Sequence, residues 1–234
     1  QSLLLNPATT REQKQTYITK RVLEFEQKGT VTHVLSDSLK LEADLLGIMV
    51  ERIVRSKADP AKRSLDDFLA LTSVPTEVMT GVSADPEALA LIEMARKAVI
   101  HLHKLSLLLS GFKINLKELT HLSLHAQDFG DLDFNALPLE EAAFNAELFA
   151  DWLRLAGYKA FAQSIPQAES DLIAVFATAS LPPADNPREK AIDQLKKATA
   201  WDAQEIDFLV GPNGLNLNAP DDFKNERRLR ELAA

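Results

Sequence analysis

Hydrophobic side chains recur at intervals of three and four residues through most of this chain, which is the spacing of one face of an α-helix. The longest such stretch runs from Asp85 to Gly111. Asp85 is a natural N-cap residue, Pro86 suits the first helical position, and Gly111 suits a left-handed residue just past the end. Its apolar stripe consists of Leu89, Ile92, Ala95, Val99, Leu102, Leu105 and Leu109. The pattern predicts a core helix of about 25 residues, roughly 37 Å long.

Three further helices are predicted before this stretch. Thr10 should cap a polar helix of about 18 residues that ends at Gly29. Its narrow apolar face consists of Tyr17, Ile18, Val22 and Phe25. A second helix carries Leu45, Ile48, Met49, Arg52 and Ile53 at helical spacing. Asp59-Pro60 breaks that helix, and Ser64 begins a short one.

Pro138 is expected to start a helix that ends at Gly157. Its stripe consists of Phe144, Leu148, Trp152 and Leu155. Helix-length segments follow to the C-terminus, and none of the chain alternates as a strand would. The expected fold class is all-α, an irregular multi-helix bundle or solenoid of about a dozen helices with no significant sheet. We expect residues 1–234 to be a single helical segment of a longer chain, with two lobes, 1–138 and 139–234, as an alternative.

The composition of the chain excludes several classes of function, although it says little more about the fold. The chain has 234 residues, 46% of them hydrophobic, and a formal net charge of −8, which argues against nucleic acid as a partner. The one basic cluster, Arg227, Arg228 and Arg230, lies between Glu226 and Glu231 and suits a solvated helix face. The absence of cysteine excludes a disulfide scaffold and thiolate catalysis. No run of apolar residues is long enough for a membrane helix.

Two segments share the same pattern of helix capping. In the first, Asn115 would be the N-cap and Glu118 its partner at the third helical position, and in the second Asp202 and Glu205 take these roles. The other matching positions are Phe112, Leu119 and Leu122 in the first segment and Trp201, Ile206 and Leu209 in the second. Around Leu41, Asp44, Leu45 and Ile48 lies a weaker third copy. Recurrent capping chemistry and common ancestry of the units both explain the pattern.

The histidines suggest metal binding only superficially. His121 and His125 lie four residues apart on one predicted helix face, and His101 and His103 are close in sequence. No glutamate follows His121, so the zinc-protease motif fails. We expect ordinary buried or surface histidines and no metal site.

Two acidic motifs are similarly incomplete. Asp131, Asp133 and Asn135 imitate the start of a calcium loop, but Ala136 and Ala142 occupy the positions that need glycine and glutamate. An Asx-rich turn is the simpler interpretation. The tripeptide Asp128-Phe129-Gly130 occurs in kinases, yet the other kinase motifs are missing. Paired carboxylates lie in first turns of predicted helices, at Asp66-Asp67, Glu140-Glu141 and Asp221-Asp222. We therefore expect no catalytic residue, no cofactor and no enzyme activity.

Four segments resemble the A subunit of bacterial insecticidal toxin complexes: LHKLSLLLSGFKINLKELTHL, DFGDLDFNALPL, ATAWDAQEIDFLVGPNGLNL and FKNERRLREL. The resemblance covers roughly residues 30 to 234, and its strongest motifs are Ser110-Gly111-Phe112-Lys113, Asp128-Phe129-Gly130 and Trp201-Asp202. The family usually has glycine before the tryptophan, where this chain has Ala200.

This resemblance implies a structural segment of the α-helical shell in a secreted, homopentameric, pore-forming subunit that translocates a toxic enzyme. Its implied partners are the rest of its own parent chain, other copies, partner toxin subunits and the host cell surface. The alternative hypothesis is a helical module that binds a host receptor or a partner subunit. The third hypothesis is a stand-alone enzyme. A shell segment should expose apolar surface around Tyr17–Phe25 and Phe223–Leu232. A binding module should instead have one confined apolar groove. An enzyme should have a pocket into which polar groups converge.

Overall fold

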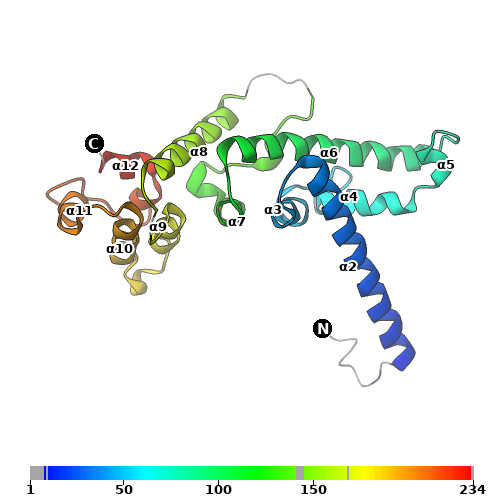
Figure 1. Cartoon of the computed structure of the whole chain (residues 1–234), viewed down its shortest axis with the longest axis horizontal. Helices are drawn as coiled ribbons and strands as arrows, with labels where there is room; N and C mark the ends of the chain where they lie inside the picture. The colour runs from blue at the N-terminus through cyan, green and yellow to red at the C-terminus, as the bar shows by residue number, and fades with distance from the viewer. Residues whose placement is uncertain (1–7, 9, 141–144, 168, 233–234) are drawn as a thin grey trace. The chain divides into compact units, whose positions relative to one another are not determined.

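The structure is a computed structural model that describes residues 8, 10–140, 145–167 and 169–232 (Figure 1). Within these ranges the chain forms eleven α-helices, α2 to α12, together with short 3-10 and π-helical turns. The same ranges contain no strand, and the β-type pairing found there is one isolated bridge between Arg55 and Arg63. The expected all-α fold class is confirmed.

The chain divides into two compact units, residues 1–111 with 134–141, and residues 112–133 with 142–234. This division differs from a boundary after Pro138. Residues 134–141 belong to the first unit because side chains of that unit bind their backbone. His101 Nε2 lies 2.8 Å from the Phe134 carbonyl oxygen, and Lys104 Nζ donates to the Pro138 carbonyl at 2.5 Å.

The first unit contains α2 (Arg11–Leu39), α3 (Ala43–Ile48), a π-helical turn (Met49–Ile53), α4 (Ser64–Ala70), α5 (Thr76–Met79) and most of α6 (Pro86–Phe112). The last turn of α2 contacts α3 and α4. The buried core consists of Leu45, Leu46, Met49, Val50, Ile53, Val54, Leu65, Phe68, Ala95, Ala98, Leu102, Leu105 and Leu109. The predicted stripe of α6 is only partly right: Ala95, Leu102, Leu105 and Leu109 line this core, whereas Leu89 and Val99 are exposed.

The second unit contains α7 (Leu116–Leu124), α8 (Ala146–Ser164), α9 (Leu172–Ala179), α10 (Pro187–Thr199), α11 (Ala203–Val210) and α12 (Glu226–Glu231). α9 packs against α10, α10 against α11, and α12 against α8. Its largest fully buried side chains are Tyr158, Phe129, Phe161, Phe176, Phe223, Leu119 and Leu122. Aromatic rings therefore fill the centre of this unit.

Three predicted helix ends at glycine are wrong, because glycine within a helix costs only about 1 kcal/mol and does not by itself end it. Gly29 lies inside α2, which continues to a left-handed Lys40. Gly111 lies inside α6, and Lys113, with φ of 53°, takes the left-handed conformation instead. Gly157 lies inside α8, where a Cβ atom would sit 3.5 Å from Glu226 Oε1. That distance is an ordinary van der Waals contact, so the side chain of Glu226 does not require glycine at this position.

The predicted start of α8 at Pro138 is also wrong. The helix begins after Asn145, whose side-chain oxygen accepts a hydrogen bond from the Leu148 amide at 3.1 Å. Trp152 and Leu155 of the predicted stripe are buried and Leu148 is partly buried, whereas Phe144 lies outside the described residues. A side-chain cap close to the helix is a stronger start signal here than a distant proline.

Candidate functional site

The histidine pair of α7 lies in a buried polar cluster. The rings of His121 and His125 stack with centroids 4.6 Å apart, and His121 is only 6% exposed. His121 Nε2 lies 3.1 Å from Asp128 Oδ2, while Asp128 Oδ1 accepts a hydrogen bond from Lys224 Nζ at 2.9 Å. The cluster thus joins α7, the turn that follows it and the turn before α12.

Burial and charge shift two pKa values in this cluster. Burial alone would raise the pKa of Asp128, but hydrogen bonds from His121 and Lys224 outweigh it and hold that pKa below its usual value. Burial, together with the neighbouring His121, lowers the pKa of His125. The folded state therefore favours an ionised Asp128 and a neutral His125.

The other two histidines do not join this cluster. In the first unit, His101 is fully buried, with Nδ1 2.6 Å from Lys57 Nζ and Nε2 directed at the Phe134 carbonyl. Because an ammonium group only donates, Nδ1 is the acceptor and Nε2 carries the proton. His103 is exposed on α6. Among the described residues, no three or more His, Asp or Glu side chains are arranged to hold a metal ion.

The residues of the calcium-like motif are assigned to different units. Asn135 belongs to the first unit, where its side-chain oxygen accepts from the Arg55 amide at 2.8 Å and its Nδ2 donates to the Ile53 carbonyl at 3.1 Å. Asp131 and Asp133 belong to the second unit, and Asp131 adopts a left-handed φ of 61°. Asn135 thus has a structural role at the end of the π-helical turn.

The Asp128-Phe129-Gly130 motif forms a structural turn. Phe129 is 1% exposed, packs edge-on against Tyr158 at 5.3 Å between ring centroids, and lies 5.8 Å from Phe176. Gly130 has φ of +79°, and a Cβ atom there would lie 2.5 Å from Asp151 Oδ1. All three residues therefore have packing or backbone roles.

A buried ion pair in the second unit was missed by the sequence analysis. Glu118 Oε1 accepts from Lys159 Nζ at 2.7 Å and from the Tyr158 hydroxyl at 3.0 Å, and Lys159 also donates to the Lys113 carbonyl. Burial, reinforced by the charge of Glu118, raises the pKa of Tyr158, so its hydroxyl stays a donor. Lys159 follows Leu155 by four residues on the apolar stripe of α8, and that misplaced charge was the available signal.

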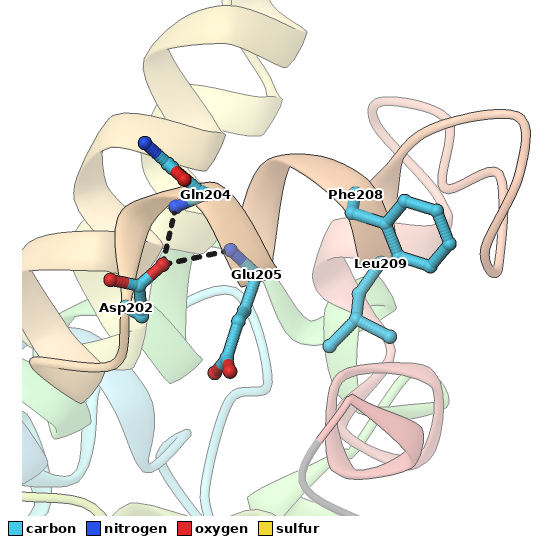
Figure 2. Close-up of a pocket in the computed structure, with 5 residues that line it drawn as sticks. All are labelled: Asp202, Gln204, Glu205, Phe208 and Leu209. Atoms are coloured by element: carbon cyan, nitrogen blue, oxygen red, sulfur yellow. Dashed lines mark hydrogen bonds between the residues drawn. The ribbon is translucent and has the colours of Figure 1, made fainter.

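The two capping segments agree at their caps and differ beyond them. Asn115 and Glu118 form the predicted capping box, with both hydrogen bonds at 2.9 Å. Asp202 Oδ1 accepts from the amides of Gln204 and Glu205 at 2.8 and 3.1 Å (Figure 2). Glu118 is buried, whereas Glu205 is exposed. Both segments thus have the predicted N-cap, but the reciprocal bond from the third helical position is found for Glu118 and not for Glu205, and the burial patterns differ.

The aromatic residues before these caps are not buried as expected. Phe112 and Trp201 are both half-buried. The Phe112 ring stacks on Trp152 with centroids 5.9 Å apart and an interplanar angle of 7°. In the weaker third copy, α3 begins after Glu42, which makes no side-chain cap hydrogen bond. The two aromatic residues were expected to be buried in equivalent positions, and they are alike only in being partly exposed.

Two hollows in the described part of the chain are candidate ligand sites. A shallow surface hollow on α11 is lined by Asp202, Gln204, Glu205, Phe208 and Leu209, with Phe208 59% exposed (Figure 2). A cavity of about 150 Å³ in the first unit includes Asp67, which already accepts from the Ser56 hydroxyl at 2.5 Å and the Lys57 amide at 2.7 Å. The surface hollow is formed by α11 and its N-cap alone. The buried Asp67 carboxylate in the cavity already accepts hydrogen bonds from Ser56 and Lys57.

The expectation of exposed apolar surface holds at one end of the chain. On α2, Ile18 is 49%, Val22 55% and Phe25 75% exposed. Near the C-terminus, Phe223 and Leu229 are fully buried because they pack into the core of the second unit, so that half of the expectation is wrong. Nor is Arg228 a freely solvated cation, since its guanidinium donates to the Leu215 carbonyl at 3.1 Å.

No protein-family model matches this sequence, and no curated protein or solved structure is detectably similar to it. Within the described ranges, no helix combines the length and the apolar character needed to cross a membrane. The structure is that of an all-α protein whose buried charged side chains, such as Glu118 with Lys159 and Asp128 with Lys224, bind one another within the fold.

Proposed function

We propose that this chain is a structural segment of the α-helical shell in the A subunit of an insecticidal toxin complex, with no catalysis of its own. The parent protein would be a secreted homopentamer that forms a pore and translocates a toxic enzyme. The chain would act through contacts with the rest of its parent chain, with other copies and with partner subunits.

The distribution of exposed apolar side chains carries this proposal. They occur on helices and turns of both units, including Phe25, Val82, Leu107, Leu124 and Phe208. A module with one binding groove would gather such residues at one place, whereas a shell segment has neighbours on several sides. The motifs that resemble the toxin family are compatible with the same interpretation, since their residues cap helices, form turns and fill the core.

A helical module that binds a partner subunit or a host receptor is the second candidate. The hollow on α11 favours it, because the apolar Phe208 and Leu209 and the acidic Asp202 and Glu205 all line it (Figure 2). An apolar anchor beside negative charge suits a partner surface that combines an apolar group with a basic side chain.

Purification of the native protein tests the leading proposal. Antibodies against α8 to α12 would capture the protein from cells that produce it, and light scattering and electron microscopy would measure its mass and symmetry. We expect particles many times heavier than this chain, with fivefold averages. A native species with the mass of one such chain would reject the proposal.

A further inference from the structure

Helix α2 carries an apolar seam with the spacing of a coiled coil. Ile18, Val22 and Phe25 follow one another at intervals of four and three residues, and all three are exposed. Continuing at the same spacing, the seam reaches Gly29, Thr32 and Ser36, and Ser36 is buried within the first unit. The exposed seam is thus continuous with the face by which α2 packs at its C-terminal end.

The N-terminal part of α2 presents this seam without burying any side chain. From Arg11 to Val34 no residue is buried, whereas Leu35 and Ser36 are. In Figure 1 this part of the helix extends beyond α3 and α4 of the same unit. A helix of such length that buries nothing along most of its course is marginal alone and gains stability from a partner.

The charges beside the seam indicate what that partner is. In heptad notation Ile18 and Phe25 occupy d positions and Val22 an a position. The g positions are then basic, at Lys14, Arg21 and Lys28, and the e positions are Glu12, Thr19, Glu26 and His33. In a parallel pair of identical helices each g residue faces the e residue five positions later on the other helix. Arg21 then faces Glu26 of the second copy, which is the one opposite-charge pair, while Lys14 faces Thr19 and Lys28 faces His33.

An antiparallel pair would instead bring g positions against g positions. Lys14, Arg21 and Lys28 would then face one another, and like charges at such a contact are unfavourable. Arg21 already pairs with Glu24 of its own helix at 2.9 Å, an exposed contact that can be exchanged at small cost.

We propose that α2 is a docking surface for α2 of a second copy of this chain, paired in parallel and in register through Ile18, Val22 and Phe25. The seam covers about two helical turns, so the pairing is reversible and concentration-dependent in the isolated chain. The inference rests on the proposed function only in that a homo-oligomer brings copies together, and in a fivefold particle the same contact would repeat between neighbouring α2 helices of a parallel bundle.

Disulfide trapping in the full chain tests this pairing, because the chain has no cysteine of its own. Ile18→Cys and Phe25→Cys place a single thiol at equivalent d positions, where facing Cα atoms of a parallel pair come within disulfide range. Each variant alone should form several-fold more covalent dimer than Lys20→Cys, whose thiol lies on the opposite face of the exposed helix. Equal yields of covalent dimer for all three variants would overturn the proposal. A disulfide that forms only when the Ile18→Cys and Phe25→Cys chains are mixed would also overturn it, because that result indicates an antiparallel pair.

A charge exchange gives a second test. In the Phe25→Cys background, Arg21→Glu should reduce the trapped dimer several-fold by placing it against Glu26 of the other copy, and the added Glu26→Arg should restore the yield. Unchanged yields in both would reject the charge pairing. If the native protein is a fivefold particle but its α2 helices form no disulfide-linked dimer, this inference alone is rejected. If the disulfide-linked dimer forms but the native protein is a single small chain, the proposed function alone is rejected.

Discussion

At the scale of single residues, the buried charges of this protein are held by partners on other segments. Glu118 contacts Lys159, Asp128 contacts Lys224, and Glu226 lies 3.6 Å from Arg154. An ion buried without a partner costs several kcal/mol, whereas an exposed pair contributes about 1 kcal/mol or less. Burial thus decides which of these pairs matter for stability.

Removing Lys159 should be far more costly than removing an exposed lysine. Lys159→Met leaves the buried Glu118 carboxylate without its cation, and we expect a loss of about 3 to 5 kcal/mol in the free energy of unfolding. Lys197→Met, which breaks the exposed pair with Asp193, should cost less than about 1 kcal/mol. Urea denaturation of both variants checks the contrast, and equal losses would contradict the assigned role of Lys159.

Ala200 should be improved by glycine. It ends α10 in a left-handed conformation with φ of 54° and ψ of 22°, which costs a residue with a Cβ atom roughly 1 to 2 kcal/mol. We expect Ala200→Gly to raise the free energy of unfolding by about 0.5 to 1 kcal/mol, once the greater freedom of glycine in the unfolded chain is subtracted. The control is Ala160→Gly, exposed inside α8, which should lower it by about 1 kcal/mol. Thermal denaturation gives both values, and destabilisation by Ala200→Gly would refute the argument.

Stability should depend on pH through His125. Its pKa is lowered in the folded state, so the unfolded chain, whose histidines titrate near 6.5, binds the proton more readily. The stabilising contribution is therefore complete above about pH 6.5 and is lost as the pH falls through the folded pKa. Asp128, whose pKa is also lowered, contributes in a separate window below about pH 4.

Urea midpoints between pH 7.5 and 5.0 would measure the effect of His125. We expect the midpoint to fall with pH in the parent chain and to fall less in His125→Asn. The exposed His103→Asn serves as the matched control and should behave as the parent chain does. A slope that His125→Asn leaves unchanged would show that another group is responsible.

At the scale of helices, caps were more predictable than ends. Thr10, Asn115 and Asp202 all accept the backbone hydrogen bonds expected of N-caps, because a capping side chain acts within its own turn. Gly29 and Gly157 were expected to end helices and do not, because glycine within a helix costs only about 1 kcal/mol and does not by itself end it.

Capping strength can be measured by comparing three helix starts. Asn115→Ala and Asp202→Ala should each lower the free energy of unfolding by about 1 kcal/mol. Glu42→Ala should have little effect, because Glu42 precedes α3 without a side-chain cap hydrogen bond. Chemical denaturation of the three variants checks this order. Losses of similar size in all three would mean that capping is not the cause.

At the scale of the whole molecule, the two ends of the chain differ. α12 packs against α8, and Phe223 and Leu229 are fully buried in the second unit. The N-terminal part of α2 leaves Phe25 75% exposed. Exposed apolar surface of this kind marks a contact with another protein surface, so the molecule is expected to assemble through α2.

The difference between exposed and buried phenylalanines provides a test. Phe25→Glu should change the free energy of unfolding by less than about 0.5 kcal/mol, as expected at an exposed position. Phe129→Ala removes a ring that is 1% exposed and should cost about 3 to 5 kcal/mol. Calorimetry on dilute protein measures both, and a large loss for Phe25→Glu would mean that the residue supports the fold of the single chain.

The sequence by itself determined the all-α class, the buried C-terminal half of the α6 stripe and the N-caps Thr10, Asn115 and Asp202, because helical periodicity and capping are interactions between residues a few positions apart. Only the tertiary structure decided that Lys159 faces Glu118, that Lys224 reaches Asp128, and that residues 134–141 join the first unit. These contacts connect residues separated by 33 to 96 positions. Local pattern can signal that a residue such as Lys159 needs a partner, but it does not identify that partner. The exposed seam of α2 combines both, since its spacing is written in the sequence and its exposure follows from where the rest of the chain packs.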